Sequence, residues 1–377
     1  MLDLPAYPWQ LLAPYKATAS AHAQGLVDLS IGAPVDPTPQ MIQDALASAT
    51  NWPGYPSAAG TDGLRDTIAD WYARRRQVPG LTKEHVAATV GSKEFIAWLP
   101  LLMGLGPGDI IVYPKVAYPT YDIGAKIVGA TSVTADTLTE LDAATRQRVK
   151  LVWVNSPANP TGTVQSAEVL AKIVADARAN GAAVASDECY AELGWGTWEH
   201  QRIPSILDTQ VSQGDFSGLL SVYSLSKQSN MAGYRAAFVA GDAAMIAALI
   251  NLRSHTGMVV PGPVQAAMAA ALTDDEHVVE QKSRYRNRRQ RLLDALVSAG
   301  LTVDDSAAGL YLWVRDPKIT EPTAEDSWEL VSRFAQLGIL VGPGVFYSAA
   351  GNGYIRVSMT AKDEAVDQAV SRLRTGL

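Results

Sequence analysis

The stretch Ser224-Leu-Ser-Lys-Gln-Ser-Asn-Met-Ala-Gly-Tyr-Arg235 is the most informative part of this chain. It places hydroxyl groups just before Lys227 and a guanidinium eight residues after it. Such groups bind phosphate, so they suit an amine that must form a Schiff base beside an anchored phosphate. The alternative is a solvated lysine in a serine-rich loop, because most lysines lie at protein surfaces.

Two further segments read as strands that end in polar side chains. In Val152-Trp-Val-Asn-Ser-Pro-Ala-Asn-Pro-Thr-Gly162, an apolar run enters a loop whose two prolines disfavour helix and hold the Asn159 amide in place. In Ala182-Ala-Val-Ala-Ser-Asp-Glu-Cys-Tyr190, a short apolar run ends in Asp187. Ligands of doubly wound sheets lie beyond the carboxyl ends of the strands, so the position of Asp187 suits a ligand contact. An Asx-Pro turn and a helix N-cap are the alternatives.

The segment Ala87-Ala-Thr-Val-Gly-Ser-Lys-Glu-Phe-Ile-Ala-Trp-Leu99 predicts a strand, a Gly-Ser turn and an amphipathic helix. The start of a helix offers unpaired N–H groups and a positive dipole end to an anion. We therefore expect Ser92 and Lys93 to give backbone donors to a phosphate. A plain N-cap role for Ser92 is compatible with this.

The four segments, in this order, resemble the cofactor site of class I/II aminotransferases of fold type I, which use pyridoxal phosphate (PLP). The resemblance implies that Lys227 binds the cofactor covalently and moves protons, and that Asp187 keeps the pyridine nitrogen protonated. It also implies that Tyr190 and Asn159 share the phenolic oxygen of the cofactor. The other cofactor residues that it implies are Ser92, Lys93, Ser224 and Arg235 around the phosphate and Tyr118, in Tyr113-Pro-Lys-Val-Ala-Tyr-Pro-Thr-Tyr121, stacked on the ring.

The same resemblance extends to the substrate and to a second subunit. Tyr354-Ile-Arg-Val-Ser-Met359 alternates as a strand does, and the resemblance implies that Arg356 pairs with the α-carboxylate of the substrate, beside Asn159. Gly32, in Leu29-Ser-Ile-Gly-Ala-Pro34, would let the backbone approach that carboxylate. Tyr55, in Gly54-Tyr-Pro-Ser-Ala-Ala-Gly60, would reach the phosphate of the partner subunit, which implies a homodimer with composite active sites.

Composition sets broad limits on function. The net charge of -7 argues against a nucleic-acid partner, and no apolar run is long enough to predict a membrane span. The five histidines show no spacing typical of a metal site, so we expect no metal. The first ten residues lack the features of a signal peptide, which favours the cytoplasm. The single cysteine, Cys189, is expected to be a packed side chain.

Length and pattern predict an α/β fold with two domains. Apolar runs that alternate with helical stretches indicate a mostly parallel, doubly wound sheet, placed at residues 31–270. Residues 271–377 are expected to form a smaller α+β domain, on which an N-terminal arm, residues 1–30, packs. The basic stretch from Lys282 to Arg291 reads as a solvated helix face.

Overall likeness is strongest to the actinobacterial N-succinyldiaminopimelate aminotransferases of lysine biosynthesis. This implies glutamate and 2-oxoglutarate as the donor pair, and a substrate with several carboxylates that needs cations beyond Arg356. Lys16, Lys115 and Arg253 are candidates. The alternatives are an aminotransferase for another amino acid, of the aspartate or alanine type, a PLP-dependent C–S β-lyase, and a non-catalytic PLP-sensing regulatory domain.

Overall fold

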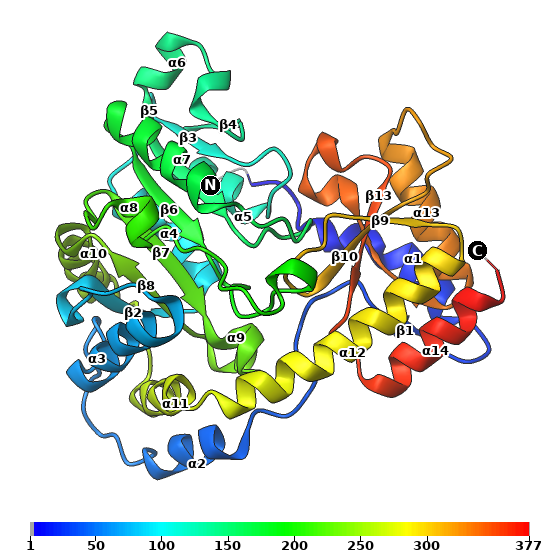
Figure 1. Cartoon of the computed structure of the whole chain (residues 1–377), viewed down its shortest axis with the longest axis horizontal. Coiled ribbons are helices and arrows are strands. Elements are labelled where there is room, and N and C mark those ends of the chain that lie inside the picture. Colours follow the sequence, from blue (N-terminus) through cyan, green and yellow to red (C-terminus); the bar gives the residue numbers. More distant parts are fainter. Residues whose placement is uncertain (1–3, 377) are drawn as a thin grey trace.

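A seven-stranded sheet forms the centre of the computed structural model, which describes residues 4–376 (Figure 1). The strands from β7 to β4 run parallel, and β8 is antiparallel to both of its neighbours. The prediction of a mostly parallel sheet is therefore confirmed. In spatial order the strands are β2 (Val86–Val90), β8 (Ala236–Gly241), β7 (Leu219–Ser224), β6 (Ala183–Asp187), β5 (Val149–Asn155), β3 (Ile110–Tyr113) and β4 (Thr131–Thr134).

Helices cover both faces of this sheet, because its strands are apolar on both sides. Alternate residues of a strand point to opposite faces: Trp153 belongs to one core cluster, and Val152 and Val154 belong to the other. The first cluster includes side chains of α4 (Ser92–Leu102), α5 (Thr120–Val128) and α10 (Ala243–Thr256). The second includes side chains of α2 (Gln40–Ser48), α3 (Asp62–Trp71), α7 (Ala167–Ala179) and α11 (Gly262–Thr273). The chain thus has the doubly wound α/β architecture that the sequence predicts.

A smaller antiparallel sheet has a core cluster of its own (Figure 1). Its strands, in spatial order, are β12 (Gly342–Pro343), β13 (Tyr354–Ser358), β10 (Tyr311–Arg315) and β9 (Thr302–Asp304). A short parallel pair, β1 (Val27–Asp28) and β11 (Ile339–Leu340), lies beside it. The remaining helices are α1 (Ala13–Ser20), α6 (Ala143–Gln147), α8 (Thr209–Ser212), α9 (Leu225–Gln228), α12 (Glu276–Ser298), α13 (Ala324–Gln336) and α14 (Asp363–Arg374).

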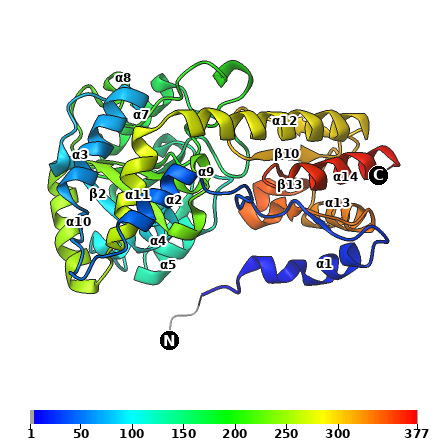
Figure 2. The same cartoon turned by 90° about the horizontal axis from the view of Figure 1, so that it is seen from below.

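The long helix α12 extends from the large sheet to the small one (Figure 2). The prediction that its basic stretch is a solvated face is wrong at Arg288. This guanidinium is buried and forms hydrogen bonds of 2.7 to 3.2 Å with the carboxylates of Asp36 and Asp363. Burial of a charge requires such partners, and the acidic residues lie too far away in sequence to be recognised as partners.

The N-terminal helix α1 packs on α13, where the rings of Tyr15 and Trp328 stack with their centroids 5.2 Å apart. This contact supports an N-terminal arm on the smaller sheet. We retain the domain division at residues 30 and 270 as a proposal.

Candidate functional site

A cavity of about 590 Å³ lies where Asp187 ends β6 and Ser224 ends β7. Its lining also includes residues 4–9 of the N-terminal segment and Arg356 of β13. The large sheet, the small sheet and the N-terminal segment therefore all contribute to one space. Of the residues predicted for the site, those that line it are Gly32, Ser92, Lys93, Tyr118, Asn159, Asp187, Tyr190, Ser224, Lys227, Arg235 and Arg356.

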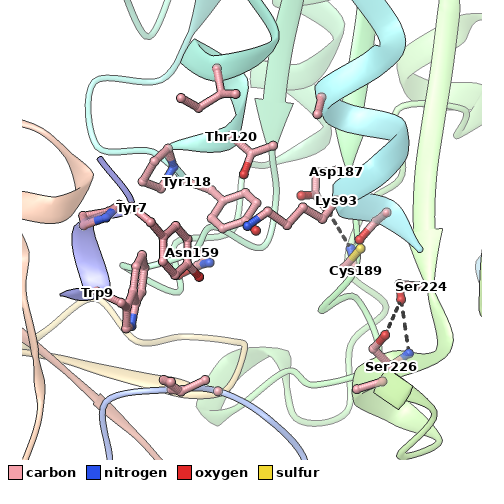
Figure 3. Close-up of a pocket in the computed structure, with 18 of the residues that line it drawn as sticks. Tyr7, Trp9, Lys93, Tyr118, Thr120, Asn159, Asp187, Cys189, Ser224 and Ser226 are labelled. Atoms are coloured by element: carbon pink, nitrogen blue, oxygen red, sulfur yellow. Dashed lines mark hydrogen bonds between the residues drawn. The ribbon is translucent and has the colours of Figure 1, made fainter. Parts of the chain in front are cut away.

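The start of helix α4 and the stretch around Lys227 form a site for an anion. Gly91, with φ of 80°, turns the chain from β2 into α4, and a Cβ at this position would lie 2.1 Å from the Arg235 guanidinium. Only glycine allows this approach, which sets the guanidinium beside the unpaired N–H groups of the helix start. The hydroxyls of Ser224 and Ser226 lie 2.8 Å apart, below the helix (Figure 3). Ser226 was not predicted individually, although it lies in the same serine-rich stretch.

The last residue of β6, Asp187, has a buried carboxylate that lines the cavity. It accepts hydrogen bonds from the Tyr121 hydroxyl at 2.9 Å and from the Cys189 backbone N–H at 3.3 Å. Burial raises the pKa of Asp187, against the lowering effect of these hydrogen bonds and of the Lys227 charge. A positive group that enters the cavity would therefore be held strongly by this carboxylate. Cys189 is buried, as predicted, and burial raises the pKa of its thiol well above the usual value.

The amine of Lys227 extends from the short helix α9 into the cavity. Its Nζ donates a hydrogen bond of 2.5 Å to the Gly32 carbonyl, which lies in the segment that follows β1. Tyr190 and Tyr311 also line the cavity, and their hydroxyl oxygens lie 3.3 Å apart. Burial raises the pKa of Tyr190 well above the usual value, so this phenol stays protonated and able to donate.

The guanidinium of Arg356 is buried and oriented by contacts from three directions. Its Nη1 donates to Asn159 Oδ1 at 2.9 Å, and its Nη2 donates to the Ser30 carbonyl at 2.7 Å. Its Cζ lies 3.9 Å from the ring centroid of Tyr311, and its buried Nε has no hydrogen-bond partner among residues 4–376. Asn159 and Arg356 are 197 residues apart in sequence, yet a hydrogen bond joins their side chains in the cavity.

The N-terminal segment lines the cavity with aromatic rings that the sequence did not indicate as site residues. Tyr7 and Trp9 stack with ring centroids 5.5 Å apart, and Arg356 lies 5.8 Å from the Trp9 ring. Lys93 extends between Tyr7 and Tyr118, with its Nζ 5.2 and 5.9 Å from the two ring centroids (Figure 3). The side chain of Lys93 therefore faces the cavity, in addition to the backbone role predicted for it.

Several predicted contributors lie outside the cavity of this chain. Tyr55 is fully exposed in the loop before α3, and its role toward a partner subunit stays a prediction. Arg253 is buried in an ion pair with Glu94, and Lys115 pairs with Glu140 at the surface. Neither they nor Lys16 belongs to the lining described for this chain, so none of the three faces the cavity of its own chain.

Residues 4–376 contain no group of three or more His, Cys, Asp or Glu side chains placed to hold a metal ion. Within the same residues, none of the helices combines the length and the apolar character needed to span a membrane.

The groups of the cavity fit PLP in each chemical respect. The helix start, Arg235 and the two serine hydroxyls suit a phosphate, and the amine of Lys227 suits an aldehyde. The buried carboxylate of Asp187 suits a protonated ring nitrogen. Tyr118 offers an aromatic face at the same cavity.

Comparisons with known proteins agree with this chemistry. Residues 24–373 match the model of the family described as aminotransferase class I and II. A 4-dedimethylamino-4-oxo-anhydrotetracycline transaminase of Streptomyces rimosus is 48% identical over 99% of this chain and 100% of its own length. A probable aminotransferase of Mycobacterium tuberculosis is 50% identical over 98% of this chain and 85% of its own length.

Two further similarities are lower but cover as much of the chain. An LL-diaminopimelate aminotransferase of Oleidesulfovibrio alaskensis is 33% identical over 99% of this chain and 97% of its own. The solved structure of a probable N-succinyldiaminopimelate aminotransferase from Thermus thermophilus superposes with a TM-score of 0.86 at 27% identity, covering 98% of this chain and 100% of that one. The chain therefore belongs to the class I and II aminotransferases, PLP-dependent enzymes that act on amino acids and 2-oxo acids.

Proposed function

We propose that this aminotransferase acts on N-succinyl-LL-2,6-diaminopimelate and its 2-oxo counterpart, with glutamate and 2-oxoglutarate as the donor pair. Support comes from the relatives whose names include diaminopimelate, one of them a solved structure of the same fold. A substrate of this kind carries several carboxylates, so its site needs more than one cation. Arg356 is one of them.

The observation that carries the proposal is Lys93, a cation of the cavity in addition to Lys227, Arg235 and Arg356. No carboxylate of residues 4–376 forms an ion pair with its ammonium, which lies against the rings of Tyr7 and Tyr118. Burial and the nearby charge of Arg235 lower the pKa of Lys93. A carboxylate placed beside it would relieve both effects and would itself gain a charge-assisted hydrogen bond. We assign Lys93 to a distal carboxylate of the substrate.

Different residues of this chain have different roles in the proposed reaction. When bound, PLP supplies an electron-withdrawing ring that acidifies the α-carbon of the substrate. Asp187 keeps a proton on the ring nitrogen, and Arg356 fixes the α-carboxylate through a planar pair of N–H donors. The free amine of Lys227 removes the proton from the α-carbon of the substrate as a general base. The helix start and Arg235 hold the phosphate throughout.

The proposal is tested by following the loss of cofactor absorbance in half-reactions of the purified holoenzyme with single amino donors. We expect N-succinyl-LL-2,6-diaminopimelate and glutamate to react far faster than alanine. Release of ammonia and a keto acid from sulfur amino acids would instead indicate a β-lyase. No reaction with the succinylated substrate would contradict the proposal.

A Lys93→Gln variant separates the distal subsite from the cofactor site, because glutamine keeps the backbone N–H that faces the phosphate. Loss of a charge-assisted hydrogen bond costs about 1.5 to 3 kcal/mol, so KM for the succinylated substrate should rise about tenfold to a hundredfold. KM for alanine should stay unchanged. The control is Lys172→Gln, a change on the exposed face of α7, which should leave KM unchanged for the succinylated substrate and for alanine. Equal losses for all substrates would mean that Lys93 serves only the cofactor.

A second substrate class is favoured by one specific observation. The Streptomyces relative, a transaminase named for a 4-oxo-anhydrotetracycline, is 48% identical over its whole length. The cavity of this chain has aromatic walls, formed by Tyr7, Trp9 and Tyr118, that suit a flat polycyclic ketone. We therefore expect a polycyclic ketone to accept the amino group from an enzyme whose cofactor has first been aminated by a donor. The return of the cofactor absorbance measures this reverse half-reaction.

We further propose that the enzyme is a homodimer in which each active site uses Tyr55 of the other subunit. The loop that carries Tyr55 and the segment 256–263 share one surface, because a Cβ on Gly262 would lie 2.1 Å from the Trp52 ring. Trp52 and Tyr55, three residues apart in this loop, both have exposed aromatic rings. Exposed aromatic rings that lie close together are typical of a subunit interface.

Complementation between two inactive variants tests the shared site. In a heterodimer of Lys227→Ala and Tyr55→Ala chains, one composite site carries both changes and the other carries neither. After complete exchange of equal amounts, random pairing should restore about one quarter of the wild-type sites. An active monomer in sedimentation, or a mixture that only averages its parents after exchange, would rule out the shared site.

A further inference from the structure

The side chain of Tyr311 contacts both Arg356, which is proposed to bind the substrate, and Tyr190, which is proposed to bind the cofactor. We propose that Tyr311 is a positioning residue whose ring fixes the plane of Arg356 and whose hydroxyl fixes the hydroxyl of Tyr190. The inference rests on the site roles assigned above to Arg356 and Tyr190. It does not depend on which amino acid is the substrate.

The pairing of two strands brings the Tyr311 ring under Arg356. Strands β10 and β13 are antiparallel, with Trp313 opposite Arg356 and Tyr311 opposite Ser358. Residues two positions apart on a strand share a face, so Tyr311 and Arg356 are diagonal neighbours on one side of the sheet. The guanidinium Cζ lies 3.9 Å from the ring centroid, which is the distance of a close cation–π contact.

This ring completes the orientation of the guanidinium. Hydrogen bonds to Asn159 and Ser30 engage Nη1 and Nη2, and the Tyr311 ring supports the flat face. A planar donor group must be held in its plane to pair with a carboxylate through two parallel hydrogen bonds. Removal of the ring would leave Arg356 anchored at its edge but able to tilt.

The hydroxyl of Tyr311 reaches in the other direction, toward Tyr190 and Gly32. It lies 3.3 Å from the Tyr190 hydroxyl, with the two rings in an edge-to-face arrangement. A Cβ on residue 32 would lie 2.1 Å from the Tyr311 oxygen, so the absence of a side chain at Gly32 makes room for this hydroxyl. The carbonyl of the same glycine accepts the hydrogen bond from Lys227.

The proposed role of Tyr190 determines the direction of the hydrogen bond between the two phenols. Burial raises the pKa of Tyr311, but the charges of Arg356 and Lys227 outweigh it, and the pKa is lowered. Burial raises the pKa of Tyr190 instead. Either hydroxyl can donate in the 3.3 Å contact, and each phenol has one hydrogen. If Tyr190 gives its hydrogen to the phenolic oxygen of the cofactor, as its proposed role requires, the contact between the two phenols uses the hydrogen of Tyr311.

Two substitutions in the holoenzyme separate the ring from the hydroxyl. Tyr311→Phe keeps the ring and removes the donor to Tyr190, which makes Tyr190 a weaker donor in turn. A weaker hydrogen bond to the proton-free phenolic oxygen should raise the pH midpoint of the cofactor absorbance change by about 0.5 unit or more. The Kd for succinate, an unreactive dicarboxylate, should stay within about twofold of wild type, because the ring under Arg356 is intact.

Tyr311→Leu removes the ring as well, so it should raise the same midpoint and also raise the Kd for succinate by about tenfold. Tyr354→Phe is the matched control. The hydroxyl of Tyr354 donates a hydrogen bond to Asp304 on the same small sheet, and neither residue lines the cavity. It should change neither quantity. An unchanged midpoint in Tyr311→Phe, or an unchanged Kd in Tyr311→Leu, would overturn the proposal. Neither readout uses the proposed substrate, so failure of the succinylated substrate to react is a separate result.

Discussion

Replacement of Lys227 with alanine is expected to slow amino transfer by about two to four orders of magnitude, the range that a positioned general acid–base supplies. The Nζ of Lys227 points into the cavity, 2.5 Å from the Gly32 carbonyl, and alanine leaves no amine at that position. The α4 start, Ser224 and Arg235 remain, so the variant should still bind the cofactor noncovalently. Single-turnover absorbance gives the rate of amino transfer. Mass spectrometry after borohydride reduction should show the cofactor attached to wild type and absent from the variant.

Two controls accompany the Lys227 prediction. Lys172→Ala removes an exposed lysine of α7 and should leave rate and mass unchanged. A small amine added to Lys227→Ala should restore part of the activity, because it supplies the missing base to an otherwise intact cavity. If the variant turned over near the wild-type rate with no added amine, Lys227 would not be the catalytic lysine.

The meeting of several residues proposed for the cofactor in one cavity could be predicted from the sequence, because these residues lie next to predictable boundaries. Asp187 and Ser224 are the last residues of strands, and Ser92 is the first residue of a helix. Apolar runs and glycine mark these boundaries, and a doubly wound sheet brings the carboxyl ends of its strands together. Local pattern and fold class together therefore place these side chains in one region.

The substrate end could be predicted only in part, because it forms where distant segments meet. Tyr311 lies in an apolar stretch, where an aromatic residue reads as core, and Trp9 lies in the N-terminal arm that was expected to pack on the smaller domain. Their places at the cavity depend on how the small sheet and the N-terminal segment pack against the large one. The buried ion pairs of Arg288 and Arg253 were missed for the same reason, since their acidic partners are far away in sequence. No periodicity encodes such contacts.

Asp187→Asn is expected to produce the second large effect. The substitution keeps the size of the side chain but removes the negative charge at the end of β6. Asp187 is buried, and loss of a desolvated charge partner costs roughly 3 to 5 kcal/mol. If the whole cost falls on the transition state, the rate of α-proton removal drops by about two to four orders of magnitude. Exchange of the α-proton of glutamate with deuterated water, followed by NMR, measures this step directly.

A graded control distinguishes the charge of Asp187 from its hydrogen bonds. Tyr121→Phe removes the hydroxyl that donates to the carboxylate at 2.9 Å but leaves the charge in place. Because one hydrogen bond to a charged group contributes about 1.5 to 3 kcal/mol, this variant should lose about one to two orders of magnitude, less than Asp187→Asn. Cofactor affinity should fall less than the exchange rate in both variants, since Arg235 and the start of α4 hold the phosphate independently. An exchange rate in Asp187→Asn equal to that of wild type would refute the assignment of this carboxylate to the ring nitrogen.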